Sequence, residues 1–232
     1  ITKVDGLPNN DINTIIRDNL GFLWIGTSDG LCRYETAEHI KIFKIDPKLP
    51  DGLRSNHIKK LHIDQENNLW IGTRQGGLTR YHLPTNTWTT FLHDPNDDTS
   101  LSNNDILSIK EDSQGHLWVG TENGLNLFDS TSNNFIHFMA NSKEDKKIKG
   151  NAILTIEEDD KGWLWVGTWG QGLYLMLPPK DNKIKETKFR RFLPSEKMGT
   201  WNVWEIYQDT DKRYWLGTHG GGLVIMNLPT NA

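Results

Sequence analysis

The chain has 232 residues, of which 35% are hydrophobic and 24% are charged, and its formal net charge is -4 at pH 7. Lysine and arginine form no coherent patch, which argues against a nucleic-acid-binding protein, and no apolar run approaches the roughly 18 residues that a membrane-spanning helix needs. The single cysteine, Cys32, excludes an internal disulfide and a cysteine-based metal cluster, so we expect neither a cofactor nor a metal site.

From the N-terminus, Ile1–Val4 fits the end of a strand, and the loop Asp5–Pro8 follows it. The next segment, Ile12–Ile15, is rich in β-branched residues and predicts a strand. The turn Asn19–Gly21 has residues that favour a tight hairpin, and the phrase Leu-Trp-Ile-Gly-Thr at Leu23–Thr27 predicts the second strand. Third and fourth strands are expected at 31–34 and 40–43.

The Leu-Trp-Ile-Gly-Thr phrase then recurs, with small variations, to the end of the chain. Its tryptophan returns after 46, 48, 47 and 50 residues, so one unit of about 46 residues fills the sequence. An aspartate precedes each tryptophan by six positions, and a Gly-Leu pair follows each phrase. This period with strand-like content is typical of four-stranded β-propeller blades. The repeats are centred on Trp24, Trp70, Trp118, Trp165 and Trp215.

We therefore predict an all-β protein: a β-propeller of five four-stranded antiparallel blades, forming one domain or domain segment over residues 1–232. The last repeat ends after a third strand at 223–226, and Ile1–Val4 could supply its fourth. Such pairing would close the ring and remove an exposed strand edge. Two alternatives stay open: a closed five-blade ring, or a segment of a larger ring.

Residues that recur in every repeat are expected to be structural, since they occupy one position of each blade. We assign the tryptophans to packing between sheets, and the aspartates and Gly-Thr pairs to turns and strand ends. The charged run Lys143–Lys149 is expected to be a solvated loop. In the first four repeats an asparagine lies 14 residues before the tryptophan and allows two interpretations, either an Asx turn or part of a ring of amides facing a polar ligand: Asn10, Asn56, Asn104 and Asn151.

Loops that vary between repeats are better candidates for function, because a propeller presents variable loops from a rigid scaffold. The loops from second to third strands and from fourth to first strands should open on one face. Trp169 and Trp201 interrupt the polar character of their loops, and an exposed indole can stack on a sugar ring while polar side chains bond its hydroxyls. The predicted ligand-binding residues are Asp29, His57, Arg74, Gln75, Glu122, Asn123, Trp169, Trp201 and His219, with Arg54, Asp105 and Lys149 on the same loops.

The repeated phrase Asn-x-Ile, then Asp-x-x-Gly-x-Leu-Trp-Val-Gly-Thr-x-x-Gly-Leu, resembles the two-component regulator propeller repeat. Residues Asn104–Phe128 match it best, whereas the fifth repeat has Tyr214 for leucine, Lys212 for the turn glycine and Trp201 for the asparagine. The resemblance covers essentially the whole chain. It implies the extracytoplasmic, periplasmic sensor region of a hybrid histidine kinase of the type that responds to glycans in gut Bacteroidetes, dimeric through the parent protein.

The predicted function is a non-catalytic sensor that recognises an oligosaccharide or another small polar ligand and regulates a histidine kinase. No catalytic residues are assigned. One alternative is a lyase or glycosidase of propeller fold, built from carboxylates and histidines such as Asp29, Asp105, Glu122, His57 and His219. Another is a platform for protein interaction or dimerisation. An enzyme requires a carboxylate pair about 5–9 Å apart, a sugar sensor requires aromatic side chains beside a polar groove, and a platform requires an exposed apolar patch.

Overall fold

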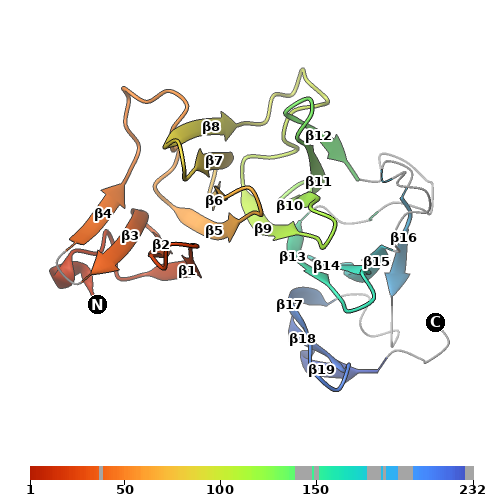
Figure 1. Cartoon of the computed structure of the whole chain (residues 1–232). Coiled ribbons are helices and arrows are strands. Elements are labelled where there is room, and N and C mark those ends of the chain that lie inside the picture. Colours follow the sequence, from red (N-terminus) through yellow and green to blue (C-terminus); the bar gives the residue numbers. More distant parts are fainter. Residues whose placement is uncertain are drawn as a thin grey trace. The chain divides into compact units, whose positions relative to one another are not determined.

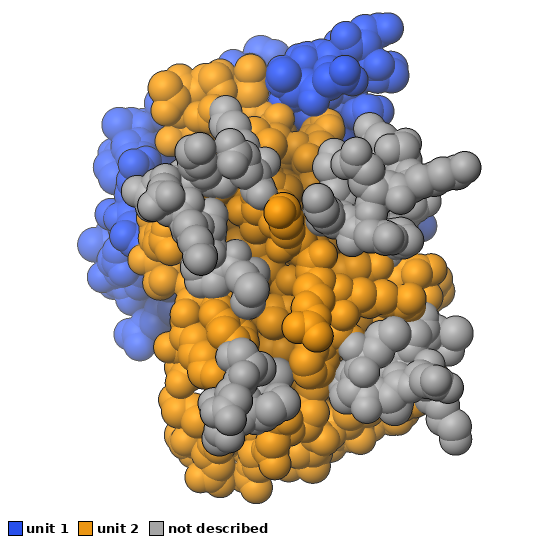
Figure 2. Space-filling view, turned by 90° about the vertical axis from the view of Figure 1, so that its right-hand side faces the viewer, with its two compact units in different colours: residues 1–109 blue, residues 110–232 orange. Residues whose placement is uncertain are grey.

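The computed structural model describes residues 1–36, 39–138, 148, 152–176, 184, 187–192 and 201–227. These residues form nineteen strands and one short 3₁₀ helix, which confirms the all-β prediction. The described part of the chain has no helix of the length and apolarity that crossing a membrane requires. The chain divides into two compact units, residues 1–109 and 110–232, coloured separately in Figure 2.

Unit 1 contains two four-stranded antiparallel sheets, each with its strands in chain order (Figure 1). The strands of the first sheet are β1 (Ile12–Arg17), β2 (Leu23–Thr27), β3 (Gly30–Thr36) and β4 (His39–Phe43). Those of the second sheet are β5 (Ile58–Ile63), β6 (Asn68–Thr73), β7 (Leu78–His82) and β8 (Thr87–Phe91). Both sheets coincide with predicted repeats.

The remaining sheets follow the same plan, and the boundary between the units falls within the first of their strands. The third sheet has β9 (Ile106–Glu111), β10 (Leu117–Thr121), β11 (Gly124–Asp129) and β12 (Asn134–His137). The fourth has β13 (Ile153–Glu158), β14 (Leu164–Thr168), β15 (Gly172–Met176) and β16 (Phe189–Phe192). The fifth has three strands in the described residues, β17 (Asn202–Gln208), β18 (Tyr214–His219) and β19 (Gly222–Met226).

The recurring aspartate and tryptophan are bonded to each other in every repeat. In the first, Asp18 Oδ2 accepts a 2.9 Å hydrogen bond from Trp24 Nε1, while Asp18 Oδ1 accepts the backbone N–H groups of Leu20 and Phe22. One carboxylate therefore closes the hairpin turn and fixes the indole six residues later. The tryptophan donates at 2.7–2.9 Å in the other four pairs: Asp64–Trp70, Asp112–Trp118, Asp159–Trp165 and Asp209–Trp215.

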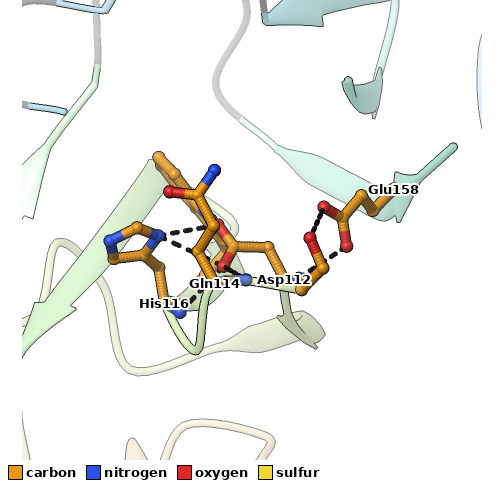
Figure 3. A network of polar contacts seen from close by, with 6 residues as sticks. Asp112, Gln114, His116 and Glu158 are labelled. Carbon is orange, nitrogen blue, oxygen red and sulfur yellow. Dashed lines mark hydrogen bonds and ion pairs between the residues drawn. The ribbon is translucent and has the colours of Figure 1, made fainter. Parts of the chain in front are cut away.

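Figure 3 shows an elaborated form of this turn in unit 2, between β9 and β10. Asp112 Oδ1 accepts hydrogen bonds from the backbone N–H groups of Gln114 and His116, and His116 Nδ1 lies 3.0 Å from Asp112 Oδ2. Glu158, at the end of β13, accepts from the Ser113 N–H at 2.7 Å and from its hydroxyl at 2.6 Å. The turn of one repeat is thereby bonded to the first strand of the next.

The glycine of the Leu-Trp-x-Gly-Thr phrase gives neighbouring sheets room to approach. A Cβ added to Gly26 in unit 1 would lie 2.6 Å from Ile58 Cγ2 on the next sheet. In unit 2, a Cβ on Gly167 would lie 2.6 Å from both Thr155 Cγ2 and the Val203 carbonyl oxygen. A side chain at this position would therefore separate the sheets, which explains why the repeat retains glycine here.

The tryptophans pack within the core, as the sequence predicts. Trp165 is fully buried in a cluster with Leu173, Val203 and Tyr214, so it joins the fourth sheet to the fifth. Trp24 likewise lies with Ile58 and Tyr81 of the second sheet. The tryptophans of the first, third and fourth sheets share their core clusters with the first strand of the next sheet.

Two details of the prediction are wrong. Ile1–Val4 is not the end of a strand, because Lys3–Asp5 forms a 3₁₀ helix whose N-terminus is capped reciprocally by Thr2 and Asp5. The fifth sheet is three-stranded in the described residues rather than four-stranded, and Ile1–Val4 is not itself a strand. Ring closure by that route is therefore not confirmed. The prediction of one domain over residues 1–232 stays a prediction.

The run Lys143–Lys149 lies outside the described residues except for Ile148, which is buried in the core of unit 2.

Candidate functional site

In unit 1 the predicted site residues lie on the loops expected of them. Arg74 and Gln75 are exposed between β6 and β7, and Gln75 has a left-handed backbone with φ 59°. Asp29, between β2 and β3, forms a 2.6 Å ion pair with Lys44 that lowers the pKa of its carboxyl group. His57 is half-buried before β5, where its carbonyl oxygen accepts a 3.0 Å hydrogen bond from the Arg74 N–H. This loop group therefore carries a neutralised carboxylate and an exposed arginine.

In unit 2 the predicted residues include part of an aromatic cluster. Trp169, on the β14–β15 loop, is 52% exposed, and its ring lies nearly parallel to that of His219, with 6.5 Å between centroids and an interplanar angle of 16°. Trp204, on β17, is 49% exposed and meets Trp169 edge to face, with 6.0 Å between centroids and an angle of 83°. We call Trp169, Trp204 and His219 the aromatic cluster.

Backbone contacts hold the Trp169 loop in place. The Trp169 N–H donates to the Ala152 carbonyl at 3.0 Å, and the N–H of Gly170 donates to Asn202 Oδ1 at 2.6 Å. Gly170 takes a left-handed backbone conformation with φ 72°. Since these bonds reach the segments before and within the neighbouring first strands, the exposed indole is presented by a fixed loop.

Sequence reasoning missed Trp204, which lies at a break in strand pairing. In β17, Val203 pairs with Thr218 and Glu205 pairs with Gly217, so Trp204 is the extra residue of a bulge. Bulges redirect a side chain out of the regular alternation. The corresponding residues of three other first strands also lie at register shifts, and they differ in kind: Asn13, Lys59 and Leu154. The sequence feature that could have pointed to Trp204 is a tryptophan at the position of the first strand where the residue type varies between repeats.

Trp201 is more buried than Trp169, and its role in ligand binding stays a prediction. It is half-buried and packs against the core cluster that contains Trp165. A Cβ on Gly221 would lie 2.5 Å from a Trp201 ring atom, so the ring lies directly on that glycine. Its carbonyl oxygen also accepts a 3.2 Å hydrogen bond from the Gly172 N–H. Trp201 thus supports the loops beside the aromatic cluster.

Glu122 and Asn123 are exposed on the β10–β11 loop of unit 2, and the Asn123 N–H donates to Thr121 Oγ1 at 3.0 Å. No ring contact or ion pair in the described residues links them to the aromatic cluster. Within the described part of the chain, no three histidine, cysteine, aspartate or glutamate side chains converge as metal ligands would.

The side chains of the recurring asparagines accept hydrogen bonds from backbone N–H groups of the preceding segment. Asn56 Oδ1 accepts the Ile45 N–H at 2.9 Å, and Asn104 Oδ1 accepts the His93 N–H at 2.8 Å, each across eleven residues. Asn10 Oδ1 accepts the Lys3 N–H in the same manner. These bonds tie the exit of one fourth strand, or the N-terminal segment, to the next first strand. They are longer-range than the predicted Asx turns, and their oxygens are occupied. Asn151 and Lys149 lie outside the described residues.

The aromatic cluster is suited to a flat ligand with alternating apolar and hydroxyl surfaces. Two half-exposed indoles at nearly a right angle offer one face and one edge, and the indole N–H and imidazole nitrogens supply polar contacts.

The model of the two-component regulator propeller family matches four segments of the chain, residues 6–29, 52–75, 100–123 and 147–170. Each segment ends just after the Leu-Trp-x-Gly-Thr strand of its repeat. The fifth repeat, which departs most from the pattern, is outside the match. The comparison with curated protein sequences found no match.

Among solved structures, the chain is similar to the extracellular domain of the hybrid two-component system BT3049 of B. thetaiotaomicron, with 25% identity and a TM-score of 0.83. The alignment covers 100% of this chain and 30% of that one, so the chain spans about a third of its relative's length. The extracellular domain of the one-component system BT4673 from the same organism is 21% identical, with coverages of 94% and 34% and a TM-score of 0.58. Virginiamycin B lyase of Staphylococcus aureus, 13% identical with a TM-score of 0.62 and coverages of 95% and 71%, shares the fold alone.

Proposed function

Because the chain belongs to the two-component regulator propeller family, we propose that it is a non-catalytic sensor propeller that recognises an oligosaccharide on the aromatic cluster of unit 2. In this proposal the chain works outside the cytoplasmic membrane, as the extracellular relatives do, and transmits binding to a histidine kinase through the dimeric parent protein. The observation that carries the ligand assignment is the pair of half-exposed tryptophans, Trp169 and Trp204.

Exposure of these indoles calls for an explanation, because the repeat tryptophans show how this fold buries aromatic rings. Trp165, on β14 directly before the Trp169 loop, is fully buried and bonded to Asp159. Trp169 and Trp204 each leave about half of their surface to solvent. The apolar C–H face of a pyranose would cover this surface, and its hydroxyls would reach the ring nitrogens.

Signalling requires more than occupancy of the site. A ligand shifts a conformational equilibrium only by the difference between its affinities for the two states. The cluster joins the β14–β15 loop of the fourth sheet to β17 and β18 of the fifth sheet. A sugar that bridges Trp169 and Trp204 would therefore favour one arrangement of those sheets over another.

Thermal unfolding against a panel of neutral host and plant oligosaccharides tests the ligand assignment. A ligand at 100 times its dissociation constant stabilises by about 2.7 kcal/mol. We expect one glycan class to raise the melting temperature, and we expect Trp169→Ala and Trp204→Ala each to abolish the rise while the free protein stays folded. Tyr207→Ala is the matched control, because Tyr207 is an exposed aromatic residue of β17 without a ring contact to Trp169. A shift that survives both tryptophan variants would place the sugar elsewhere, and a folded protein with no shift would overturn the ligand assignment.

A further inference from the structure

Unit 1 contains a cavity of about 380 Å³ between its two sheets, at the end of the strands where the hairpin turns lie. One wall is the β1–β2 turn at residues 18–20, and the other is formed by Asn67 and residues 83–84 from the β5–β6 and β7–β8 turns. Because antiparallel strands alternate in direction, this is the opposite end from the loops of Asp29 and Arg74. The volume is in the range of small-molecule sites, and none of the residues that line the cavity belongs to the predicted ligand-binding set.

Arg33 of β3 completes the cavity wall, at a repeat position where unit 2 has apolar side chains. It pairs with Trp24 across the first sheet, whereas the residues that pair with the repeat tryptophans of unit 2 are Leu127, Leu175 and Ile225. The guanidinium lies over the Phe22 ring, 5.0 Å from its centroid, and one of its nitrogens contacts Glu35. Its Nε is buried and has no hydrogen-bond partner among the described residues. Arg33 therefore has donors that its own fold does not use.

Two side-chain amides from different sheets meet at this cavity. Asn19 Nδ2 donates a hydrogen bond to Asn67 Oδ1, which connects the β1–β2 turn to the β5–β6 turn. This bond leaves the Asn19 carbonyl oxygen as an acceptor and the Asn67 amide nitrogen as a donor. Asn67 has a left-handed backbone with φ 61°, and its carbonyl oxygen accepts the Leu83 N–H at 3.1 Å. The polar wall is therefore held in place by bonds of the protein itself.

The remaining lining and the local charges favour an uncharged ligand. Leu20, which is 81% exposed, and residues 83–84 supply apolar surface. Asp18 also lines the cavity, and its oxygens already accept hydrogen bonds from its own turn and from the repeat tryptophan. An anionic ligand would approach two carboxylates, those of Asp18 and Glu35, and a cationic ligand would lie beside the Arg33 guanidinium. Like charges at such short range repel each other.

We propose that this cavity binds a small uncharged ligand through a secondary amide group with an apolar substituent. The ligand's carbonyl oxygen accepts from the Arg33 guanidinium and the Asn67 amide, and its N–H donates to the Asn19 carbonyl oxygen. The apolar substituent lies against Leu83 and Pro84. The acetamido group of an amino sugar and the amide of a blocked amino acid both have this chemistry. The cavity has no residue in common with the aromatic cluster of unit 2, so the inference does not rest on the proposed function.

An NMR titration of the chain with N-acetylglucosamine, and a second with N-acetyl-leucine methylamide, tests the proposal and distinguishes the two sources of the amide. At the ligand efficiency of small molecules, a compound of about fifteen heavy atoms binds with a Kd of about 1 mM. Glucose, which has the sugar ring without the amide, should bind at least about tenfold more weakly. Because each removes one amide contact, Arg33→Met and Asn19→Ala should each weaken binding by about tenfold or more. Arg80→Met is the matched control, since Arg80 pairs with Trp70 as Arg33 pairs with Trp24 but does not line the cavity.

Binding of either probe that is lost in both cavity variants and kept in Arg80→Met would support the proposal and identify the source of the amide. Equal binding of glucose would overturn the amide assignment, and so would a folded chain that binds neither probe. Binding that survives Arg33→Met but is lost in Trp169→Ala would belong to the aromatic cluster, and would overturn the cavity assignment while supporting the proposed function. If Arg33→Met does not fold, Asn19→Ala decides the outcome, because Asn19 is exposed on a turn.

Discussion

At the scale of single residues, the aspartate–tryptophan pair stabilises both the hairpin turn and the buried indole of each repeat. Its carboxylate satisfies the hairpin backbone with one oxygen and the indole N–H with the other, as at Asp159 and Trp165. A buried indole needs such a partner, because an unpaired N–H in the core is costly. Tyr214 of the next sheet donates to the same Asp159 oxygen at 2.7 Å, so the pair also joins two sheets. The burial of Tyr214 and its bond to Asp159 raise the pKa of the tyrosine.

Replacement of these tryptophans should cost stability in proportion to their burial. Trp165→Ala leaves a cavity between the fourth and fifth sheets, and we expect a loss of about 3–5 kcal/mol in the free energy of unfolding. Trp215→Ala removes a half-exposed ring, and should cost clearly less. Urea unfolding of both variants checks the ranking, and equal losses would contradict the packing roles assigned to the two rings.

The carboxylate of the last repeat gives a pH dependence. Burial alone would raise the pKa of Asp209, but hydrogen bonds from Trp215 Nε1 and from the backbone and side chain of Arg213 outweigh it and lower the pKa to about 2. Because the folded value lies below the unfolded value of 3.8, the stabilisation is fully present above about pH 4 and disappears as the pH falls towards 2. The melting temperatures of wild type and Asp209→Asn should therefore differ at pH 6 and approach each other as the pH falls from 4 towards 2. A constant difference over that range would refute the assignment.

At the scale of elements, glycines and bulges set how the strands meet. The second-strand glycine admits the next first strand, and the register shift near the start of β1, β5, β13 and β17 releases one side chain from the sheet. That released position carries a different residue in each of these strands, and in β17 it carries Trp204. The same backbone irregularity thus carries side chains of different kinds, and in β17 it exposes Trp204.

Two glycines at the same repeat position should respond differently to alanine. Gly167→Ala would force a methyl group to within 2.6 Å of Thr155 and of the Val203 carbonyl. We expect it to destabilise unit 2 by about 1–3 kcal/mol, as overpacking does. Gly217→Ala has 3.5 Å to its nearest neighbour and should change stability by less than about 0.5 kcal/mol. Denaturant unfolding compares the two directly, and a tolerated Gly167→Ala would show that the sheets can separate at little cost.

At the scale of the whole molecule, the chain consists of two compact units built from one repeat. Apolar side chains at equivalent repeat positions are not equally buried in all five sheets. Most apolar side chains at the repeat positions are buried within their own unit. Among the described residues of unit 2, the large apolar side chains that stay exposed are those of Trp169, Trp204, Tyr207, Leu223 and Ile225.

A glutamate in place of the leucine of the Gly-Leu pair should distinguish a buried copy of this position from an exposed one. Leu173→Glu buries a carboxylate in the core of unit 2 and should unfold that unit at moderate temperature, because an unpaired charge there is very unfavourable. Leu223→Glu, at the same repeat position, should leave the melting temperature of the 232-residue chain within about 2 °C of the wild type, a surface-type effect. Circular dichroism melts provide the comparison. A large destabilisation by Leu223→Glu would mean that this face is already buried.

The sequence by itself determined the repeat, the strand content, the hairpin turns and the structural role of the tryptophans, because each follows from local chemistry that recurs at a fixed period. It also placed the variable loops of Arg74, Trp169 and His219. It could not show that Ile1–Val4 leads into a capped 3₁₀ helix, since a short β-branched segment is compatible with either form until its partners are known. Nor could it separate Trp169 from Trp201, as both are loop tryptophans and their difference is burial. Tertiary structure decided that one ring rests on Gly221, that the other meets Trp204, and that Leu223 is uncovered, because these outcomes depend on which neighbour lies across each side chain.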